Sequence, residues 1–158
     1  MNIRIGFGYD IHRLEIGFPL VIGGIFIEHE KGAVGHSDAD VLIHAIMDAL
    51  LGAAGLRDIG VYFPDSDPGL KNIDSKILLS KTMELVKSQG FIIGNIDATI
   101  CLEKPKIAAY IPEMKMVLAA IMEISAGQVS VKATTSEGLG FVGSEQGISA
   151  YAVALLSK

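Results

Sequence analysis

The sequence of 158 residues lacks tryptophan, has one cysteine (Cys101) and four histidines, and is only 6% aromatic. Scarce aromatic side chains argue against a protein that stacks on nucleic-acid bases. A single cysteine makes no internal disulfide, which is typical of a reducing compartment such as the cytoplasm. The longest uncharged runs, residues 16–27 and 147–157, are shorter than the roughly 18 residues of a membrane span. We therefore expect a cytoplasmic protein with no membrane partner; a plastid-type organelle stays open if a longer precursor exists.

The sequence also has no cluster of basic residues. It carries 13 Lys and Arg against 18 Asp and Glu, a formal net charge of −5, so we expect no nucleic-acid partner. Hydrophobic residues make up 50% of the chain and charged residues 20%, which excludes a disordered protein. The length predicts one domain, and the apolar composition of so small a chain predicts an apolar surface buried against another subunit.

The hydrophobic pattern predicts alternating strands and helices. Ser37 fits the N-cap of the first helix, with Asp38 and Asp40 in its first turn, and Gly55 ends it. We expect strands or hairpins at 3–12, 20–27, 91–102, 129–133 and 149–156, helices at 37–54, 74–88 and from Pro105 or Pro112 to Ser125, and loops at 31–35, 58–70 and 136–147. This order predicts an α+β domain in which one layer of helices covers one face of a mixed sheet.

A candidate metal site arises from two histidines and a carboxylate. Asp10 and His12 are two residues apart on a predicted strand, so both side chains lie on one face. His44 lies off the apolar face of the first helix and can point at a strand end. Two imidazoles and one carboxylate form a three-ligand zinc set with one open position, and Asp48 or a backbone carbonyl would hold the second nitrogen of His44. The alternative is an ordinary polar strand end beside a solvated helix face.

Several segments are suited to phosphate. Ser37 opens a helix, where free N–H groups attract anions, although it can serve as a cap alone. Hydroxyls at 134–136 can donate to phosphate oxygens, and Glu137 can hold a hard cation; the alternative is a plain strand end. We expect residues 65–67 to form a turn that contacts substrate hydroxyls. Residues 104–106 can contact a diphosphate or form a surface turn, and Cys101 is expected to be an inert core residue. No P-loop, dinucleotide fingerprint or nucleophile elbow occurs.

Taken together, these motifs resemble the 2-C-methyl-D-erythritol 2,4-cyclodiphosphate synthases of the non-mevalonate pathway of isoprenoid biosynthesis. The resemblance covers nearly the whole chain. It rests on RIGFGYDIH at 4–12, HSDADV at 36–41, His44, DALLGA at 48–53, DIG at 58–60, FPDSDP at 63–68, PK at 105–106 and KATTSEGLGF at 132–141.

The resemblance implies a ferredoxin-like fold, residues 1–158 as a single cyclodiphosphate synthase domain, and a homotrimer with active sites between subunits. It implies zinc on Asp10, His12 and His44, a second divalent cation (Mg²⁺ or Mn²⁺) on Glu137, and transition-state contacts from His36 and Thr135. The implied substrate contacts are Ser37, Asp58, Ile59, Gly60, Phe63, Asp65, Asp67, Leu102, Pro105, Lys106, Ile107, Ala108, Thr134, Ser136, Glu137 and Phe141.

The implied reaction is the cyclisation of 4-diphosphocytidyl-2-C-methyl-D-erythritol 2-phosphate with release of CMP, by a phosphorus–oxygen lyase. The alternatives are a zinc phosphohydrolase, a non-catalytic trimeric protein that binds isoprenoids or nucleotides, and a purely structural oligomer. One departure from the family pattern stands out, because Ser144 and Gln146 replace an arginine and a glutamate. The resemblance therefore predicts a weakened contact with isoprenoid diphosphates along the trimer axis.

Overall fold

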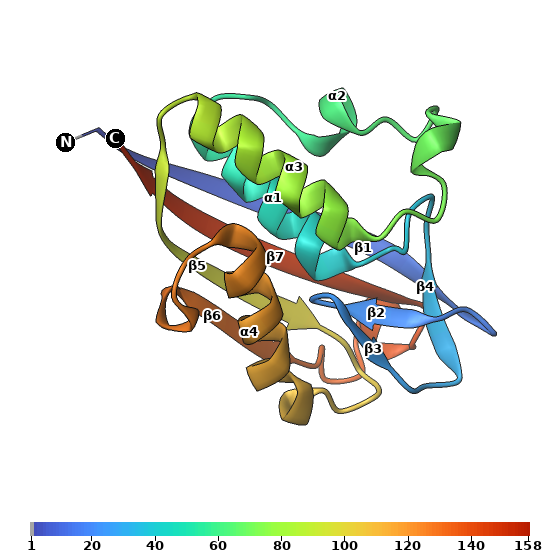
Figure 1. Cartoon of the computed structure of the whole chain (residues 1–158). Helices are drawn as coiled ribbons and strands as arrows, with labels where there is room; N and C mark the ends of the chain where they lie inside the picture. Colours follow the sequence, from blue (N-terminus) through green and yellow to red (C-terminus); the bar gives the residue numbers. More distant parts are fainter. Residues whose placement is uncertain (1) are drawn as a thin grey trace.

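The computed structural model describes residues 2–158 as an α+β domain (Figure 1). In chain order its elements are β1 (Ile3–Ile16), β2 (Leu20–Ile22), β3 (Ile25–Ile27), β4 (Lys31–Val34), α1 (Val41–Ala54), α2 (Ile59–Tyr62), α3 (Ser75–Ser88), β5 (Ile92–Cys101), α4 (Ile111–Met122), β6 (Val129–Thr134), α5 (Gly140–Gly143) and β7 (Gly147–Ser157), with 3₁₀ turns at Pro68–Leu70, Ala108–Tyr110 and Ala126–Gln128.

Five strands form one mixed sheet in the order β4-β1-β7-β5-β6. All neighbours are antiparallel except β5 and β6, which are parallel because α4 connects them. The helices α1, α3 and α4 cover one face of this sheet, as Figure 1 shows. The hairpin of β2 and β3 forms a separate two-stranded sheet beside α4 and β4. The predicted mixed sheet with helices on one face is confirmed.

The first strand and the first helix are in backbone contact. Gly6 and Gly8 face α1, and a Cβ atom on either residue would lie within 2 Å of a helix carbonyl, Ala49 O or Ala45 O. Glycine is required at both positions, because any side chain would push the helix off the sheet. This close approach brings the second turn of α1 next to the residues that follow Gly8 on β1.

The opposite face of the sheet is open and apolar. On β1 the side chains of Ile3, Ile5, Phe7, Tyr9 and Ile11 alternate outward, and Ile5 is 70% exposed. Tyr151 and Val153 of β7 extend the same surface, and the Tyr9 and Tyr151 rings lie 5.0 Å apart. An exposed patch of this extent on a small domain marks an interaction surface.

Some local expectations were wrong. Helix α1 begins at Val41, with Asp40 as the N-cap, because the Asp40 carboxylate accepts a hydrogen bond from Ile43 N (3.0 Å). Ser37 instead accepts from Ala39 N in the loop before the helix. The expected loop at 31–35 is largely strand β4, which pairs with a longer β1. The expected loops at 58–70 and 136–147 each contain a short helix, α2 and α5.

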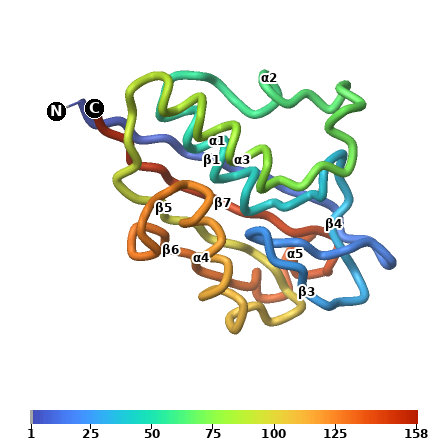
Figure 2. The backbone as a smooth tube through the Cα atoms, in the orientation of Figure 1, coloured from blue at the N-terminus to red at the C-terminus, as the bar shows by residue number. Residues whose placement is uncertain are grey.

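The segment between α1 and α3 returns to the start of α1. Figure 2 shows it leaving α1, passing through α2 and coming back beside the end of β4. Two backbone hydrogen bonds close this excursion, from Asp38 N to Ile73 O (3.1 Å) and from Asn72 N to His36 O (2.8 Å). Among the residues described, no helix is long and apolar enough to span a membrane.

Candidate metal-binding active site

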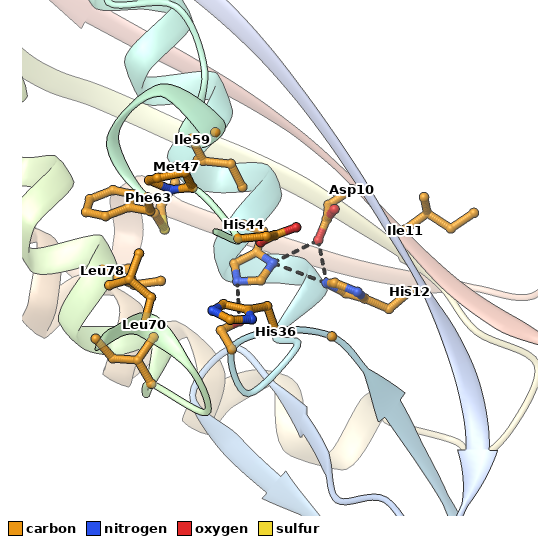
Figure 3. A pocket seen from close by; sticks show the side chains of 16 residues that line it. Asp10, Ile11, His12, His36, His44, Met47, Ile59, Phe63, Leu70 and Leu78 are labelled. Atoms are coloured by element: carbon orange, nitrogen blue, oxygen red, sulfur yellow. Dashed lines mark hydrogen bonds and ion pairs between the residues drawn. The ribbon is translucent and has the colours of Figure 1, made fainter. Parts of the chain in front are cut away.

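Three side chains from two elements converge at the end of the β1–α1 contact. Asp10 and His12 project from β1, and His44 projects from the second turn of α1. Asp10 Oδ2 lies 2.9 Å from His12 Nε2 and 3.0 Å from His44 Nδ1, and the two ring nitrogens are 3.2 Å apart. Figure 3 shows the three side chains pointing toward one another, while Ile11 points away. The alternation along β1 is the one predicted from the sequence.

This donor set fits a divalent transition metal. Asp10, His12 and His44 are the one group of at least three potential ligands found within residues 2–158. Ligands bound tetrahedrally about 2.0–2.2 Å from zinc lie roughly 3.3–3.6 Å from one another. The observed separations of 2.9–3.2 Å require an outward movement of only a few tenths of an ångström. Two imidazoles and one carboxylate leave a fourth position free, which is typical of catalytic zinc.

The electrostatics of the cluster couple these groups. Burial raises the pKa of Asp10, but hydrogen bonds from His12 and His44 outweigh it and lower the pKa to about 2. Burial lowers the pKa of His44, but the hydrogen bond and charge of Asp10 outweigh that effect and raise it above its ordinary value. The cluster therefore favours a carboxylate beside cationic imidazole, and a metal ion would take the place of the proton.

The second nitrogen of His44 has hydroxyl partners. Nε2 lies 3.0 Å from Ser75 Oγ and 3.2 Å from Ser37 Oγ. The prediction that Asp48 or a backbone carbonyl would hold this nitrogen was wrong. Asp48 lies one turn further along α1 and its Oδ1 accepts a hydrogen bond from Ile59 N (2.8 Å). Asp48 thus anchors the start of α2.

Asp40 is also not on a solvated face. It is completely buried and accepts hydrogen bonds from Gly23 N (2.9 Å) and Gly24 N (2.7 Å) as well as from Ile43 N. Burial raises its pKa to about 6 despite these three donors. Asp40 therefore ties the turn of the β2–β3 hairpin to the N-terminus of α1.

The three candidate metal ligands, Asp10, His12 and His44, line one side of a cavity of about 540 Å³. The predicted transition-state residue His36 joins Asp10, His12 and His44 in its lining, together with five predicted substrate contacts: Ser37, Ile59, Gly60, Phe63 and Asp65. His36 Nε2 donates to Asp67 O (3.0 Å), which joins the loop before α1 to the loop after α2. Asp58 is exposed at the N-cap of α2, beside this cavity but outside its lining.

Most of the other predicted contacts form a second group, which does not line this cavity: Leu102, Pro105, Lys106, Ile107, Ala108, Thr134, Thr135, Ser136 and Glu137. Most of them follow the ends of β5 and β6. Phe141 lies apart from this group, in a pocket that it shares with Ile11 and His12. The register places Asp10 opposite Ala150, Ala150 opposite Ile100 and Ile100 opposite Ala133. Strand spacings of about 4.8 Å place the end of β5 about 10 Å, and the end of β6 about 14 Å, from Asp10 across the sheet.

The second group is held together locally. Ser136 N donates to Glu103 Oε2 (3.2 Å), and Glu137 N donates to Thr135 Oγ1 (3.3 Å). Lys104 forms an ion pair with Glu145 (3.0 Å). The segment 104–106 does not open a helix, because α4 begins at Ile111 after a 3₁₀ turn.

Cys101 was predicted in the core, but it is half-buried at the end of β5. It lies on the same strand face as Asp97 and Thr99, which is the open face of the sheet. Ser75 was not predicted to contact the site at all. It is 31 residues from His44 and no local pattern marks it, because only the packing of α3 against α1 brings the two together.

Comparison with known proteins places this geometry among named relatives. Residues 3–157 match the YgbB family. The chain is 65% identical over 153 residues to the 2-C-methyl-D-erythritol 2,4-cyclodiphosphate synthase of Porphyromonas gingivalis, covering 97% of this chain and 94% of that protein. It is 61% identical over 158 residues to the synthase of Bacteroides fragilis, covering 100% and 99%.

Solved structures agree with these relatives. A CDP-bound 2C-methyl-D-erythritol-2,4-cyclodiphosphate synthase superimposes with a TM-score of 0.90 at 38% identity, covering 98% of this chain and all of that one. The bifunctional IspDF from Campylobacter jejuni gives a TM-score of 0.94 at 37% identity, where 98% of this chain corresponds to 42% of the longer protein.

Proposed function

The chain belongs to the YgbB family, and from this membership and the site geometry we propose that it converts 4-diphosphocytidyl-2-C-methyl-D-erythritol 2-phosphate into 2-C-methyl-D-erythritol 2,4-cyclodiphosphate and CMP. The observation that carries the proposal is the convergence of Asp10, His12 and His44 in an open cavity, in a chain 61–65% identical to named synthases. The whole chain, residues 1–158, would act as one synthase domain in the cytoplasm.

The reaction would be an internal phosphoryl transfer. An oxygen of the 2-phosphate attacks the β-phosphorus, a new P–O bond forms, and the bond to the α-phosphate oxygen breaks with departure of CMP. No water is consumed, so the enzyme would be a phosphorus–oxygen lyase. The attacking group belongs to the substrate, and the protein has to bring two anionic groups into line.

We assign the charge-neutralising role to the metal triad and its neighbours. Zinc on Asp10, His12 and His44 would supply Lewis-acid stabilisation of phosphate charge. His36 lines the same cavity, and its Nε2 is committed to Asp67 O, which fixes the orientation of the ring. Ser37 lies in the loop before α1, lines the same cavity and can donate to a phosphate oxygen.

A homotrimer with active sites between subunits is supported by two features. The open sheet face carries exposed Ile5 and Phe7, which need an apolar partner. The proposed transition-state residues His36 and Thr135 lie in separate groups on one chain, because His36 lines the cavity beside β1 and Thr135 follows β6, three strands away in the sheet. A neighbouring copy that supplied its second group would complete the site.

The second group would bind the cytidine diphosphate end of the substrate. Backbone and side chains from Leu102 to Ala108 would surround the base, and the turn from Thr134 to Ser136 would contact phosphate. Glu137 is exposed beside Thr135 and is suited to a hard cation such as Mg²⁺ or Mn²⁺. Asp58, Ile59, Gly60, Phe63, Asp65 and Asp67 would contact the methylerythritol.

Phosphorus NMR with the authentic substrate, zinc and Mg²⁺ tests the proposal. We expect two coupled cyclic-diphosphate resonances together with CMP, and loss of both when the metals are chelated. The His44→Ala variant should give no product, because it loses one of three metal ligands. Release of inorganic phosphate would instead identify a phosphohydrolase. Absence of any turnover by zinc-loaded protein would leave a binding protein.

A further inference from the structure

We propose that Ser75 and Asp38 are positioning residues that fix the ring of His44 for metal binding by accepting the proton of its Nε2. The inference deepens the proposed function, because it concerns the same metal site. Neither residue touches the open metal position. They act through His44, from the side of the ring that faces away from Asp10 and His12.

The contacts form a continuous chain from His44 through buried Ser75 to half-buried Asp38. His44 Nε2 is 3.0 Å from Ser75 Oγ. The Ser75 hydroxyl donates to Asp38 Oδ1, and Ser75 N donates to Asp38 Oδ2 (3.0 Å). Ser75 is completely buried, so water does not compete for its hydrogen bond with His44. The Asp38 carboxylate thus accepts hydrogen bonds from both the side chain and the backbone of Ser75.

This arrangement prepares His44 for a metal ion on Nδ1. Because the Ser75 hydroxyl gives its hydrogen to Asp38, its oxygen is left to accept a hydrogen bond from His44. Once a metal ion replaces the proton that Nδ1 shares with Asp10, Nε2 is the nitrogen that carries the remaining hydrogen, and Ser75 holds it. Nδ1 is the nitrogen that lies beside Asp10 Oδ2 (3.0 Å) and His12 Nε2 (3.2 Å). The negative charge of Asp38 strengthens the hydrogen bond that Ser75 Oγ accepts from His44 Nε2.

Ser37 offers a matched contrast. Its Oγ is 3.2 Å from the same His44 Nε2 and accepts a hydrogen bond from Ala39 N (3.2 Å). No carboxylate takes the hydroxyl hydrogen of Ser37 among the hydrogen bonds of the described chain. Ser37 can therefore donate to Nε2 or accept from it, and it does not select a tautomer. Of the two hydroxyls beside His44 Nε2, only that of Ser75 donates its hydrogen to a carboxylate and is left as an acceptor.

The test compares zinc affinity among the intact full-length variants Ser75→Ala, Ser75→Thr and Ser37→Ala, by competition with a chromophoric chelator. Loss of an outer-shell partner typically costs 10–100-fold in metal affinity. We expect a 10–100-fold weaker Kd for Ser75→Ala, a value within about threefold of wild type for Ser75→Thr, which restores the hydroxyl, and a change of less than about threefold for Ser37→Ala. Unchanged affinity in Ser75→Ala, or an equal loss in Ser37→Ala, would overturn the proposal.

A second measurement follows the Nε2–H hydrogen of His44 in the zinc-loaded protein by NMR. We expect this hydrogen to exchange slowly with solvent in the wild type and faster in Ser75→Ala and Asp38→Ala, because the buried Ser75 oxygen no longer holds it. Equal exchange in the wild type and both variants would refute the roles of Ser75 and Asp38. A wild type that binds no zinc at all would instead contradict the metal site of the proposed function.

Discussion

At the residue scale, each polar side chain around His44 has a defined hydrogen-bond partner. His44 contacts Asp10 with Nδ1 and Ser75 with Nε2, so the orientation of its ring is held from both nitrogens. Asp48 and Asp40 flank His44 by one turn on either side, and each binds backbone N–H groups of a different segment. One helix of 14 residues therefore positions a ligand, the α2 loop and the β2–β3 hairpin.

Asp40 predicts a pH dependence of stability. Its pKa rises from 3.8 in the unfolded chain to about 6 in the fold. The folded state keeps this proton longer than the unfolded state, so the stabilisation is full below about pH 4 and is lost as the pH rises through about 6. The contribution is at most about 3 kcal/mol. Urea unfolding of wild type and Asp40→Asn between pH 4 and 7 should show a difference in unfolding free energy that shrinks with rising pH. A constant difference would contradict the assignment.

At the element scale, the contact between β1 and α1 is the central packing feature. Helices usually rest on sheets through side chains, but here Gly6 and Gly8 let the helix backbone touch the strand. The alanines at 45, 49 and 53 of α1 are completely buried at this surface. Because Asp10 and His44 each lie next to this contact, the distance between the two ligands depends on it.

Two glycine substitutions test whether the close contact between β1 and α1 requires glycine. Gly8→Ala would place a Cβ 1.9 Å from Ala45 O, so we expect it to destabilise the fold by about 3 kcal/mol or more and to weaken metal binding. Gly52→Ala on the same helix meets no atom within 4 Å and should stabilise the fold by about 0.5–1 kcal/mol. Chemical unfolding at matched protein concentration measures both. A tolerated Gly8→Ala would show that the helix can move away without cost.

At the scale of the whole molecule, the open sheet face predicts assembly. The core between sheet and helices is closed, whereas the far face of β1 and β7 leaves Phe7 and Tyr151 uncovered. Their rings lie 6.4 Å apart, so they form part of one continuous surface rather than isolated exposed residues. Burial of this surface against copies of the chain, as proposed, would account for the apolar composition.

A charge on this face should dissociate the assembly. Wild type is expected to sediment at three times the 16.7 kDa chain mass, and Phe7→Glu as a monomer without turnover, because a buried unpaired carboxylate is costly. Phe26→Glu is the control, since Phe26 on β3 is equally exposed, at 63%, but lies outside the five-stranded sheet. Analytical ultracentrifugation measures both variants. Dissociation by Phe26→Glu alone would place the interface on the hairpin instead.

Local sequence signals predicted most of the elements and the three candidate metal ligands. Period-two alternation placed Asp10 and His12 on one strand face, the apolar stripe of α1 left His44 off its centre, and glycines marked the ends of α1 and α3, because each of these signals acts within a few residues. The caps were harder to predict, since Ser37 and Asp40 are both good capping residues and only Asp40 meets the hairpin glycines.

Contacts between residues that are distant in sequence became visible only in the folded chain. Ser75 reaches His44 because α3 packs on α1, Asp48 meets Ile59 because the chain turns back after Gly55, and strand β4 exists because β1 continues far enough to pair with it. The separation of the proposed substrate contacts into two groups follows from the strand order β1-β7-β5-β6. Strand order and helix packing are long-range contacts, which no pattern of neighbouring residues encodes.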